Sequence, residues 1–392
     1  MHNVKMKTMP VRHFNACKNH TVGVELELQL IDPNTKELTT GTTKLLKSLN
    51  GYPHVKHELF ESVIEINSVP CLTIDELKND LIKHVRVLYE HASKLGIKLT
   101  MAGTHPTTNW ALQKISPLKR YQDIVDKIQM PVKRMLIFGL HVHIGVGSGD
   151  EAIVINNALM DYLPHLLALS ASSPFWVKRD SGMESYRVKI LETLPTTGLP
   201  FKLHSYEEFN DLVSVLKKAG TIESIRELWW DVRPHPDFGT IEVRVCDAMP
   251  LLDDVISIAA FIQALIADLA KKYRCRDEIG HLPSFLIREN KWRAARYGID
   301  GVLIMDSLGK TVSVKDAIEK LIFELEPTAK ELKADKELRN LKEIFKRGTS
   351  SKRQRKVLKE TNKNWNMLVD SLIDEFESSW GLKKSLTGAS LK

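Results

Sequence analysis

Four short segments of the chain share one pattern, in which aliphatic residues alternate with glutamate, histidine or arginine. The segments are residues 21–30, 58–69, 139–146 and 240–248 (TVGVELELQL, ELFESVIEINSV, GLHVHIGV and TIEVRVCDA). Successive side chains of a β-strand point to opposite faces, so each segment predicts a strand with one apolar and one polar face. An apolar sheet face must be covered by other elements. The pattern therefore constrains the fold to a sheet with helices packed on one side.

The polar faces of these strands carry residues that bind metal ions and anions. They comprise Glu25, Glu27 and Gln29; Glu61, Glu65 and Asn67; His141 and His143; and Thr240, Glu242, Arg244 and Cys246. Each strand taken alone is also explained by polar side chains that face water. Taken together, so many carboxylates on one face repel one another unless cations offset their charge. Mg²⁺ prefers oxygen ligands and substrate phosphates, so the sequence predicts a metal–nucleotide site on an open sheet face.

Helical patterns separate and follow the strands. Thr73 and Glu76 form a capping box ahead of apolar residues at helical spacing, and Gly96 ends that helix. Asp150 is the expected cap of another helix, with a break near Pro164. Further helices are predicted over residues 205–220, 252–274, 313–334 and 362–379. We expect one catalytic domain over residues 1–300 and a helical C-terminal portion, residues 301–392, packed on the same domain.

The composition is that of a globular protein without a membrane segment. No run of 18 apolar residues occurs, and the N-terminal stretch MHNVKMKTMPVRHF has no apolar centre typical of a secretory signal. We therefore expect a cytoplasmic protein with no membrane partner. The four cysteines, Cys17, Cys71, Cys246 and Cys275, form no C-x-x-C pair, which excludes a zinc module built on thiols.

The net charge of +7 favours anionic partners such as nucleotides and acidic metabolites. Its densest stretch is residues 346–359 (KRGTSSKRQRKVLK). A solvated helix face is the simpler explanation of this run, and a phosphate or nucleic-acid patch is the alternative. No RNA- or DNA-binding motif accompanies the run, so nucleic acid is not an expected partner.

Residues 288–298 (RENKWRAARYG) gather a second group of cations, namely Arg288, Lys291, Arg293 and Arg296. If the segment is helical, Glu289 lies four residues before Arg293, which is a good spacing for an ion pair. The group is therefore either a salt-bridged helix face or a clamp for nucleotide phosphates.

Nine motifs together resemble the glutamate–cysteine ligase type 2 family, and within it the carboxylate–amine ligases of the YbdK type. They are GVELEL (23–28), ESVIEINS (61–68), AGTHP (102–106), RYQDI (120–124), GLHVHIGV (139–146), LLALSASSPFW (166–176), SYR (185–187), WWDVRPHPDFGTIEVRVCD (229–247) and RENKWRAARYG (288–298). The resemblance runs in consistent order from about residue 20 to residue 300. Its two most specific motifs are GLHVHIGV and WWDVRPHPDFGTIEVRVCD.

The resemblance implies a glutamine-synthetase-like α+β fold, in which an antiparallel sheet forms the floor of the site. It also implies an ATP- and Mg²⁺-dependent carboxylate–amine ligase. The carboxylate of glutamate or a related acid would be activated as an acyl phosphate and coupled to an amine such as cysteine. A non-catalytic ATP- or metal-binding protein on the same scaffold is the alternative. The implied partners are a small-molecule acid and amine, and a homo-oligomer is compatible with the sequence.

The resemblance also implies roles for individual residues. Carried over by position, the metal sites would use Glu25, Glu27, Glu65, His141 and Glu242. Strand alternation adds Glu61 to this set, whereas the spacing to Glu65 in distant ligases favours Glu58, and the sequence leaves the choice open.

The remaining roles concern catalysis and substrate binding. Glu27, Glu65 and Arg244 would be catalytic, with Arg244 stabilising the transferred phosphoryl group, and Arg179 and Tyr186 would contact the acid or the amine. To nucleotide phosphates we assign His143 and the cluster of Arg288, Lys291, Arg293 and Arg296.

Overall fold

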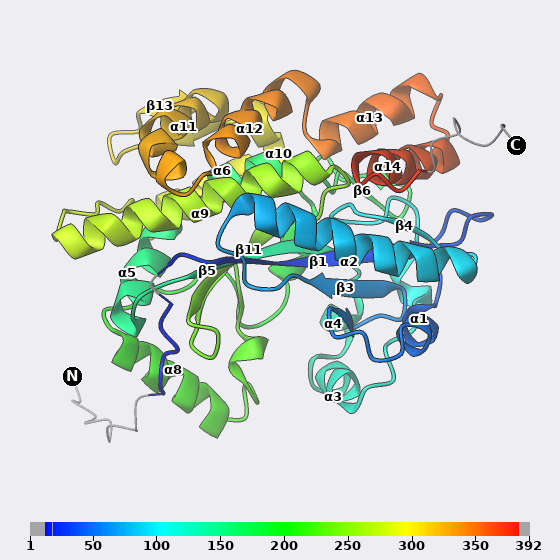
Figure 1. Ribbon diagram of the computed structural model, residues 1–392, viewed down its shortest axis with the longest axis horizontal. Helices are drawn as coiled ribbons and strands as arrows, with labels where there is room; N and C mark the ends of the chain where they lie inside the picture. The colour runs from blue at the N-terminus through cyan, green and yellow to red at the C-terminus, as the bar shows by residue number, and fades with distance from the viewer. Residues whose placement is uncertain (1–11, 18, 384–392) are drawn as a thin grey trace, which may run out of the picture.

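The computed structural model describes residues 12–17 and 19–383, and its centre is an antiparallel sheet (Figure 1). The strand order is β10 (Val232–His235), β11 (Thr240–Asp247), β5 (Gly139–Gly145), β1 (Val22–Ile31), β3 (Val63–Asn67) and β2 (Val55–His57), and β4 (Lys98–Thr100) also pairs with β1. The four patterned segments are thus β11, β5, β1 and β3, which are consecutive neighbours in the sheet. Their polar faces form one continuous surface.

The register between these strands brings the polar side chains together. Glu25 lies opposite His141, and Glu27 lies opposite Glu65. On the other side of β5, His143 lies opposite Glu242. Directly opposed residues of antiparallel strands share a face, so carboxylates and imidazoles meet side chain to side chain.

The alternation fails at one point on β11. Val243 pairs with Val142 and Cys246 pairs with Leu140, so β11 contains one residue more than β5 between these pairs. A β-bulge of this kind reverses the alternation beyond it. The prediction that Cys246 shares the polar face with Arg244 is therefore wrong, since Cys246 is fully buried in the core.

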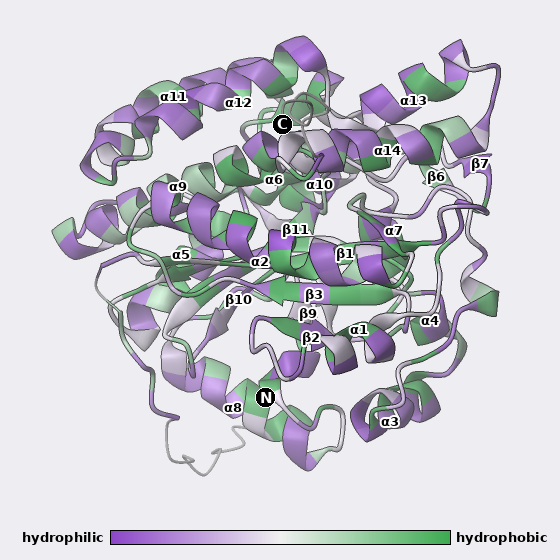
Figure 2. Ribbon diagram, turned by 45° about the vertical axis from the view of Figure 1, so that its right-hand side comes forward, coloured by the Kyte–Doolittle hydropathy of each residue, from purple (hydrophilic) through white to green (hydrophobic). Residues whose placement is uncertain are grey.

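Helices cover the apolar face of the sheet, as predicted. The first layer consists of α2 (Ile74–Lys94), α9 (Leu252–Cys275), α5 (Gly149–Leu159) and α6 (Leu163–Ser170). Leu26, Val142 and Ile241 on the strands are fully buried and belong to one core with these helices. Over α9 and α6 lie α10 (Ser284–Tyr297), α11 (Val314–Glu331) and α12 (Asp335–Arg347), whereas α14 (Trp365–Ser379) packs on β4 and carries α13 (Ser350–Glu360). Figure 2 shows hydrophobic strands between helices whose outer surfaces are mainly hydrophilic.

Side-chain caps define where two predicted helices begin. The Thr73 hydroxyl accepts a hydrogen bond from the Glu76 backbone N–H, which confirms the cap expected for α2. At α5 the cap is Ser148, which accepts from the Glu151 N–H, and not Asp150. Asp150 instead accepts a hydrogen bond from the backbone N–H of Tyr206 and so links α5 to the helix that Tyr206 begins.

Short elements border the polar face of the sheet on its other side. They are α1 (Thr42–Ser48), α3 (Lys119–Ile128), α4 (Met130–Lys133), α7 (Arg187–Leu191), α8 (Tyr206–Lys218), β8 (Thr197–Gly198) and β9 (Trp229–Trp230). Smaller hairpins and turns complete the described chain: β6 (Phe175–Trp176) with β7 (Arg179–Asp180), β12 (Val302–Ile304) with β13 (Thr311–Ser313), and the 3-10 turns η1 (Trp110–Leu112), η2 (Ile225–Glu227) and η3 (Gly298–Asp300). The polar face is therefore open at its middle and walled at its margins.

The basic run of residues 346–359 is largely neutralised from within the chain. Its ion pairs join Arg347 and Arg353 to Asp254, Arg353 to Glu375, Lys352 to Asp300, and Arg355 to Asp180 and Glu184. Arg355 also donates to the backbone carbonyl of Met183. The run thus fastens α13 to α9, α14 and the segment after β7, which neither a solvated face nor a nucleic-acid patch would require.

Two further sequence expectations concern the cysteines and membrane spans. All four cysteines are free, and Cys71 and Cys246 are buried. Within residues 12–17 and 19–383, no single helix has the length and apolar content to cross a membrane. The pair α5 and α6 reaches that threshold only jointly, with a bend of 64° between them.

Gly139, at the start of β5, lies under the Arg187 side chain. A methyl group at position 139 would lie 2.4 Å from Arg187 Nη2 and 2.8 Å from His141 Nε2. We expect Gly139→Ala to lower the free energy of unfolding by about 1–3 kcal/mol, the usual cost of overpacking, in urea denaturation. Gly23→Ala on neighbouring β1 is the control, because its nearest atoms would lie 3.8 Å away. Equal stability of the two variants would contradict this account of Gly139.

Candidate active site

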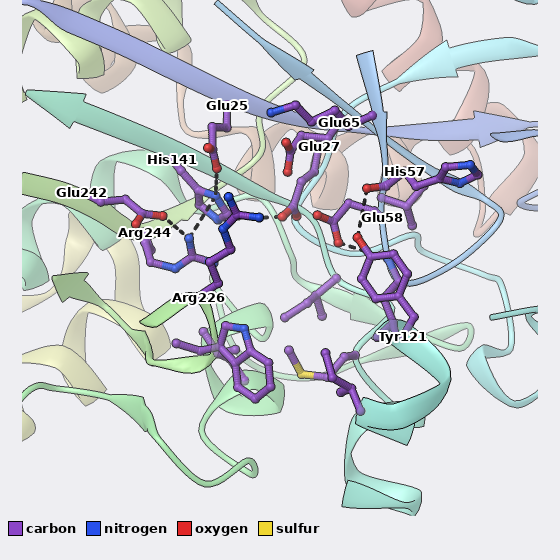
Figure 3. A pocket seen from close by; sticks show the side chains of 18 of the residues that line it. Glu25, Glu27, His57, Glu58, Glu65, Tyr121, His141, Arg226, Glu242 and Arg244 are labelled. Carbon is purple, nitrogen blue, oxygen red and sulfur yellow. Dashed lines mark hydrogen bonds and ion pairs between the residues drawn. The ribbon is translucent and has the colours of Figure 1, made fainter. Parts of the chain in front are cut away.

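A cavity of about 260 Å³ opens on the polar face of the sheet. Its floor consists of polar side chains from β1, β3, β5, β10 and β11, and its walls come from α3, α4, α7 and the segment that leads into β9 (Figure 3). Figure 3 places Arg244, Arg226 and Glu242 at one end of the row of polar side chains, and Glu58 and Tyr121 at the other.

Two groups of three ligand-type residues lie side by side on this floor. The first comprises Glu25, His143 and Glu242, and the second comprises Glu27, Glu58 and Glu65. Within each group the ligand atoms all lie within 4.8 Å of one another. His141 lies between the two groups, because its Nδ1 is 3.1 Å from Glu25 and its Nε2 is 3.8 Å from Glu27.

The second group concentrates negative charge away from water. Burial raises the pKa of Glu27 to about 7. Burial and the neighbouring Glu27 raise the pKa of Glu58 to about 7, and burial with the charges of Glu25 and Glu58 raises the pKa of Glu65 well above its usual range. Three ionised carboxylates can share this space only with a cation between them. A set of three hard oxygen donors fits Mg²⁺.

The first group already contains compensating charge. Burial opposes ionisation of Glu242, but Arg233 and Arg244 hold its pKa well below the usual range. Burial likewise opposes ionisation of Glu25, while hydrogen bonds with His141 and His143 keep its pKa well below normal. Burial and Arg244 lower the pKa of His141 to about 4. His141 is therefore a neutral imidazole at physiological pH, the form that binds metal ions.

Two arginines flank Glu242 and differ in how firmly they are held. Arg233 Nε donates to Glu242 Oε2 at 2.6 Å, and its Nη1 donates to the carbonyls of Ile225 and Leu228 at 2.9 and 2.7 Å. Arg244 pairs with the other oxygen of Glu242 and approaches His141 Nδ1 at 3.4 Å. Arg233 is thus anchored to the framework, whereas Arg244 reaches into the cavity from the β-bulge. Arg233 had no predicted role, although its place on β10 puts it opposite Glu242.

The bulge that carries Arg244 is held from beneath by Arg187. The Arg187 guanidinium donates to the carbonyls of Arg244 and Val245 at 3.2 and 3.3 Å. Asp247, fully buried, lies 4.0 Å from Arg187 and accepts hydrogen bonds from Ser172, Ser173 and Ser185. Arg187 also lines the cavity. Its positive charge lowers the pKa of Glu27 and so opposes the larger effect of burial, which raises that pKa.

The two residues expected to contact the acid or amine lie outside this cavity. Arg179 is exposed on β7. Tyr186 packs with Trp176, ring centroids 6.2 Å apart, in a small apolar cluster with Ile137, Ile190 and Leu191. Of the motif SYR, Arg187 lines the cavity and Tyr186 does not.

Of the two glutamates that the sequence left open, the structure brings Glu58 and not Glu61 next to Glu27 and Glu65. β3 begins at Val63, so the strand alternation that favoured Glu61 does not extend to it. The Glu61 carboxylate accepts hydrogen bonds from the Thr43 hydroxyl at 2.6 Å and the Thr43 N–H at 3.2 Å, away from the other carboxylates. Glu58 takes the place in the second group that Glu61 was expected to fill.

The cationic cluster of α10 does not reach the cavity either. Lys291 is fully buried and pairs with Asp231 and Glu192. Arg293 pairs with Glu289 at 2.8 Å, which confirms the helical ion pair. Arg288, Lys291, Arg293 and Arg296 all lie outside the cavity lining. Ion pairs within the chain therefore account for Lys291 and Arg293, and the structure does not bring the cluster to the cavity.

Three other cations, to which no role was predicted, line the cavity. Lys56, Arg120 and Arg226 come from β2, α3 and η2. None of the three has an acidic partner within residues 12–17 and 19–383. Their positions depend on which loops fold over the sheet, and no local sequence pattern signals that.

Comparisons with known proteins agree with this geometry. The family model described as glutamate–cysteine ligase family 2 (GCS2) matches residues 21–371. A Frankia alni protein provisionally named glutamate–cysteine ligase 2-1 is 41% identical over 374 residues, which cover 93% of this chain and 97% of that protein. A Gloeobacter violaceus protein provisionally named glutamate–cysteine ligase 2 is 40% identical over 348 residues, or 88% of this chain and 94% of that protein. The family match also extends beyond residue 300, where the motifs ended.

Solved structures share the fold at low sequence identity. A bifunctional glutathione synthetase from Pasteurella multocida superposes with a TM-score of 0.67 at 14% identity, over 92% of this chain and 52% of that chain. The glutamate–cysteine ligase of Francisella tularensis, solved in complex with AMP, has a TM-score of 0.63 at 14% identity over 94% of each chain. They confirm the predicted α+β fold. The chain belongs to the glutamate–cysteine ligase family 2 and is a carboxylate–amine ligase.

Proposed function

We propose that the protein uses Mg²⁺–ATP to join the carboxylate of glutamate, or of a related acid, to an amine. The observation that carries the proposal is the pair of three-ligand groups on one cavity floor, with Arg244 beside them. Phosphoryl transfer needs positioning and charge neutralisation more than a covalent nucleophile, and this floor offers both. The AMP complex of the Francisella tularensis ligase supports a nucleotide in a fold of this kind. A need for ATP accords with a cytoplasmic location.

Each group has the residues to hold one Mg²⁺. Glu25, His143 and Glu242, with His141 next to them, would bind the first ion, and Glu27, Glu58 and Glu65 would bind the second. When bound, the ions neutralise phosphate oxygens and polarise the γ-phosphate. His143, which we had assigned to the nucleotide phosphates, thus fits the first metal group.

The proposed reaction has two steps, a phosphoryl transfer to the acid and an acyl transfer to the amine. A carboxylate oxygen of the acid attacks the γ-phosphorus and the bond to the β–γ bridging oxygen breaks. ADP departs, and an acyl phosphate is formed. The amine nitrogen then attacks the carbonyl carbon, the bond to the phosphate oxygen breaks, and the amine proton passes to water. Arg244 lies where its guanidinium would bind the transferred phosphoryl oxygens, while Glu27 and Glu65 lie at the centre of the floor and orient the reacting groups.

We assign to Arg226 the binding of substrate anions, which the sequence predicted for the cationic cluster of α10. Arg226 lies at the same end of the row as Arg244 in Figure 3, lines the cavity and is exposed. A guanidinium without an acidic partner is free to pair with a phosphate or carboxylate of the substrates.

The direct test is ADP release with Mg²⁺–ATP and L-glutamate, with and without a panel of amines, and with the product identified by mass. Release that an amine stimulates, together with an amide product, is the expected result. ATP binding with no amine-dependent turnover across panels of acids and amines would replace this proposal by a non-catalytic binding protein.

Glu58 and Glu61 form a matched pair of variants. Glu58→Gln removes one charge from the second group, so we expect ADP release to fall by about a hundredfold and the Mg²⁺-dependent rise in melting temperature to shrink. Glu61→Gln weakens its bonds to Thr43 and its contact with His57, both outside the two groups of ligands, so activity persists while stability falls by about 1–2 kcal/mol. Full activity of Glu58→Gln, or loss of turnover only in Glu61→Gln, would return the metal role to Glu61.

Arg226 and Arg288 form a second matched pair. Arg226→Ala removes a cation from the cavity, so we expect kcat/KM for ATP or the acid to fall about tenfold or more. Arg288→Ala changes an exposed residue of α10 outside the cavity and leaves both constants unchanged. Steady-state kinetics of the two purified variants measures this, and the reverse pattern would restore the α10 phosphate clamp.

A further inference from the structure

The cationic cluster of α10 lies outside the cavity, yet one of its residues is joined to two segments that border it. Lys291 is 1% exposed, and its ammonium pairs with Asp231 and, at 2.7 Å, with Glu192. Asp231 lies between β9 and β10, and Glu192 follows the last residue of α7. Burial opposes the positive charge of Lys291, but the two carboxylates hold its pKa above the usual range. Lys291 is therefore a buried ammonium that links three separate segments of the chain.

The two segments that Lys291 joins each hold one backbone group of Arg244. The Arg244 N–H donates to the Asp231 carbonyl at 2.8 Å. The Arg244 carbonyl accepts a hydrogen bond at 3.2 Å from the guanidinium of Arg187, the first residue of α7. Because the β-bulge takes Arg244 out of the regular strand pairing, its backbone groups need partners from outside the ladder. Asp231 and α7 supply both partners.

A second contact from α10 supports Arg187. Ala295 lies one helical turn after Lys291, and its carbonyl is among the last four of the helix, which have no partner within it. This carbonyl accepts a hydrogen bond from the Ser185 N–H at 3.0 Å. Ser185 Oγ donates to Asp247 at 2.9 Å, and Asp247 lies 4.0 Å from Arg187. The helix α10 thus holds the chain just before Arg187 as well as just after α7.

We propose that Lys291 is a positioning residue for Arg244, because its ammonium fixes Asp231 and α7 relative to each other and thereby the backbone of the bulge between them. Lys291 does not line the cavity, so it would act only through Arg244. The part of Arg244 in phosphoryl transfer rests on the proposed function, whereas the position of the bulge does not. A misplacement of about 1 Å in a group that contacts the reacting atoms can cost about a hundredfold in rate.

Amide hydrogen exchange tests the position of the bulge without turnover. Lys291→Met keeps the length of the side chain and removes its charge, so we expect the Arg244 amide to exchange at least tenfold faster than in the unsubstituted protein. The amides of β3 are the reference within the same sample and should exchange at an unchanged rate. An unchanged rate at Arg244, or an equal rise in β3, would show that Lys291 serves only the stability of the whole fold and would overturn the proposal.

Arg293→Met is the matched control on the same helix. The partner of Arg293 is Glu289, 2.8 Å away and also in α10, so this ion pair joins the helix to no other segment. We expect Arg293→Met to leave exchange at Arg244 unchanged.

A second variant keeps the proposal testable should Lys291→Met not fold, since that substitution leaves the buried Asp231 without its cation. Glu192→Gln weakens only the link to α7 and leaves Lys291 paired with Asp231, and the Glu192 side chain is 30% exposed. We expect exchange at Arg244 to rise about threefold in Glu192→Gln. If Lys291→Met does not fold, an unchanged rate in Glu192→Gln overturns the proposal.

Steady-state kinetics tests whether the effect reaches the reaction through Arg244. We expect Lys291→Met to lower kcat about tenfold or more and to leave KM for ATP unchanged, as for an interaction made only in the transition state. In an Arg244→Ala background the same substitution should change kcat less than twofold. Loss of folded protein would lower the rate by one factor in both backgrounds, so equal factors overturn the proposal.

The two measurements separate this inference from the ligase proposal. Faster exchange at Arg244 in Lys291→Met, with no amide formed by the unsubstituted protein, defeats the ligase proposal alone. Amide formation by Lys291→Met at an unchanged kcat, with unchanged exchange at Arg244, defeats this inference alone.

Discussion

Repulsion among carboxylates on one face of a sheet is the constraint on which the rest of this structure depends. Glu27, Glu58 and Glu65 lie together in a buried group, and each has a raised pKa because burial and neighbouring charge both penalise ionisation. The carboxylates cannot move apart, because the register of β1 and β3 places Glu27 directly opposite Glu65. A fold that keeps such an arrangement needs cations to complete it.

Arginines supply part of the positive charge, and the backbone of β11 determines where one of them, Arg244, lies. The β-bulge on β11 keeps Arg244 on the polar face while it turns Cys246 into the core. Arg187 holds the carbonyls of the bulge, and Asp247 with its serine donors lies beneath Arg187. Arg244, the cation proposed for phosphoryl transfer, is therefore positioned by a buried polar network that runs from Arg187 to Asp247. The C-terminal basic run contributes at longer range, since Arg355 holds the segment between β7 and Arg187.

Much of the floor could be predicted from the sequence because strand alternation is a local property. Glu25, Glu27, Glu65, His141, His143 and Glu242 all lie where the period of two places them. The prediction failed where the period was interrupted, at the bulge before Cys246 and at the turn that precedes β3. At the bulge one extra residue reverses the side of the residues beyond it, and before β3 the turn at residues 61–62 ends the alternation that favoured Glu61.

The sequence by itself determined the class of fold, the residues of the floor and the family, since these follow from short-range periodicity and from motifs in consistent order. Only the tertiary structure decided what surrounds the floor. The α10 cluster and Tyr186 lie outside the cavity lining, whereas Arg226, Lys56, Arg120 and Arg187 belong to it, and α3, α4 and α7 contribute apolar side chains to its wall. These residues lie far apart along the chain, and a cation is available to a ligand only if no carboxylate of the fold neutralises it. That depends on long-range packing, which no local pattern encodes.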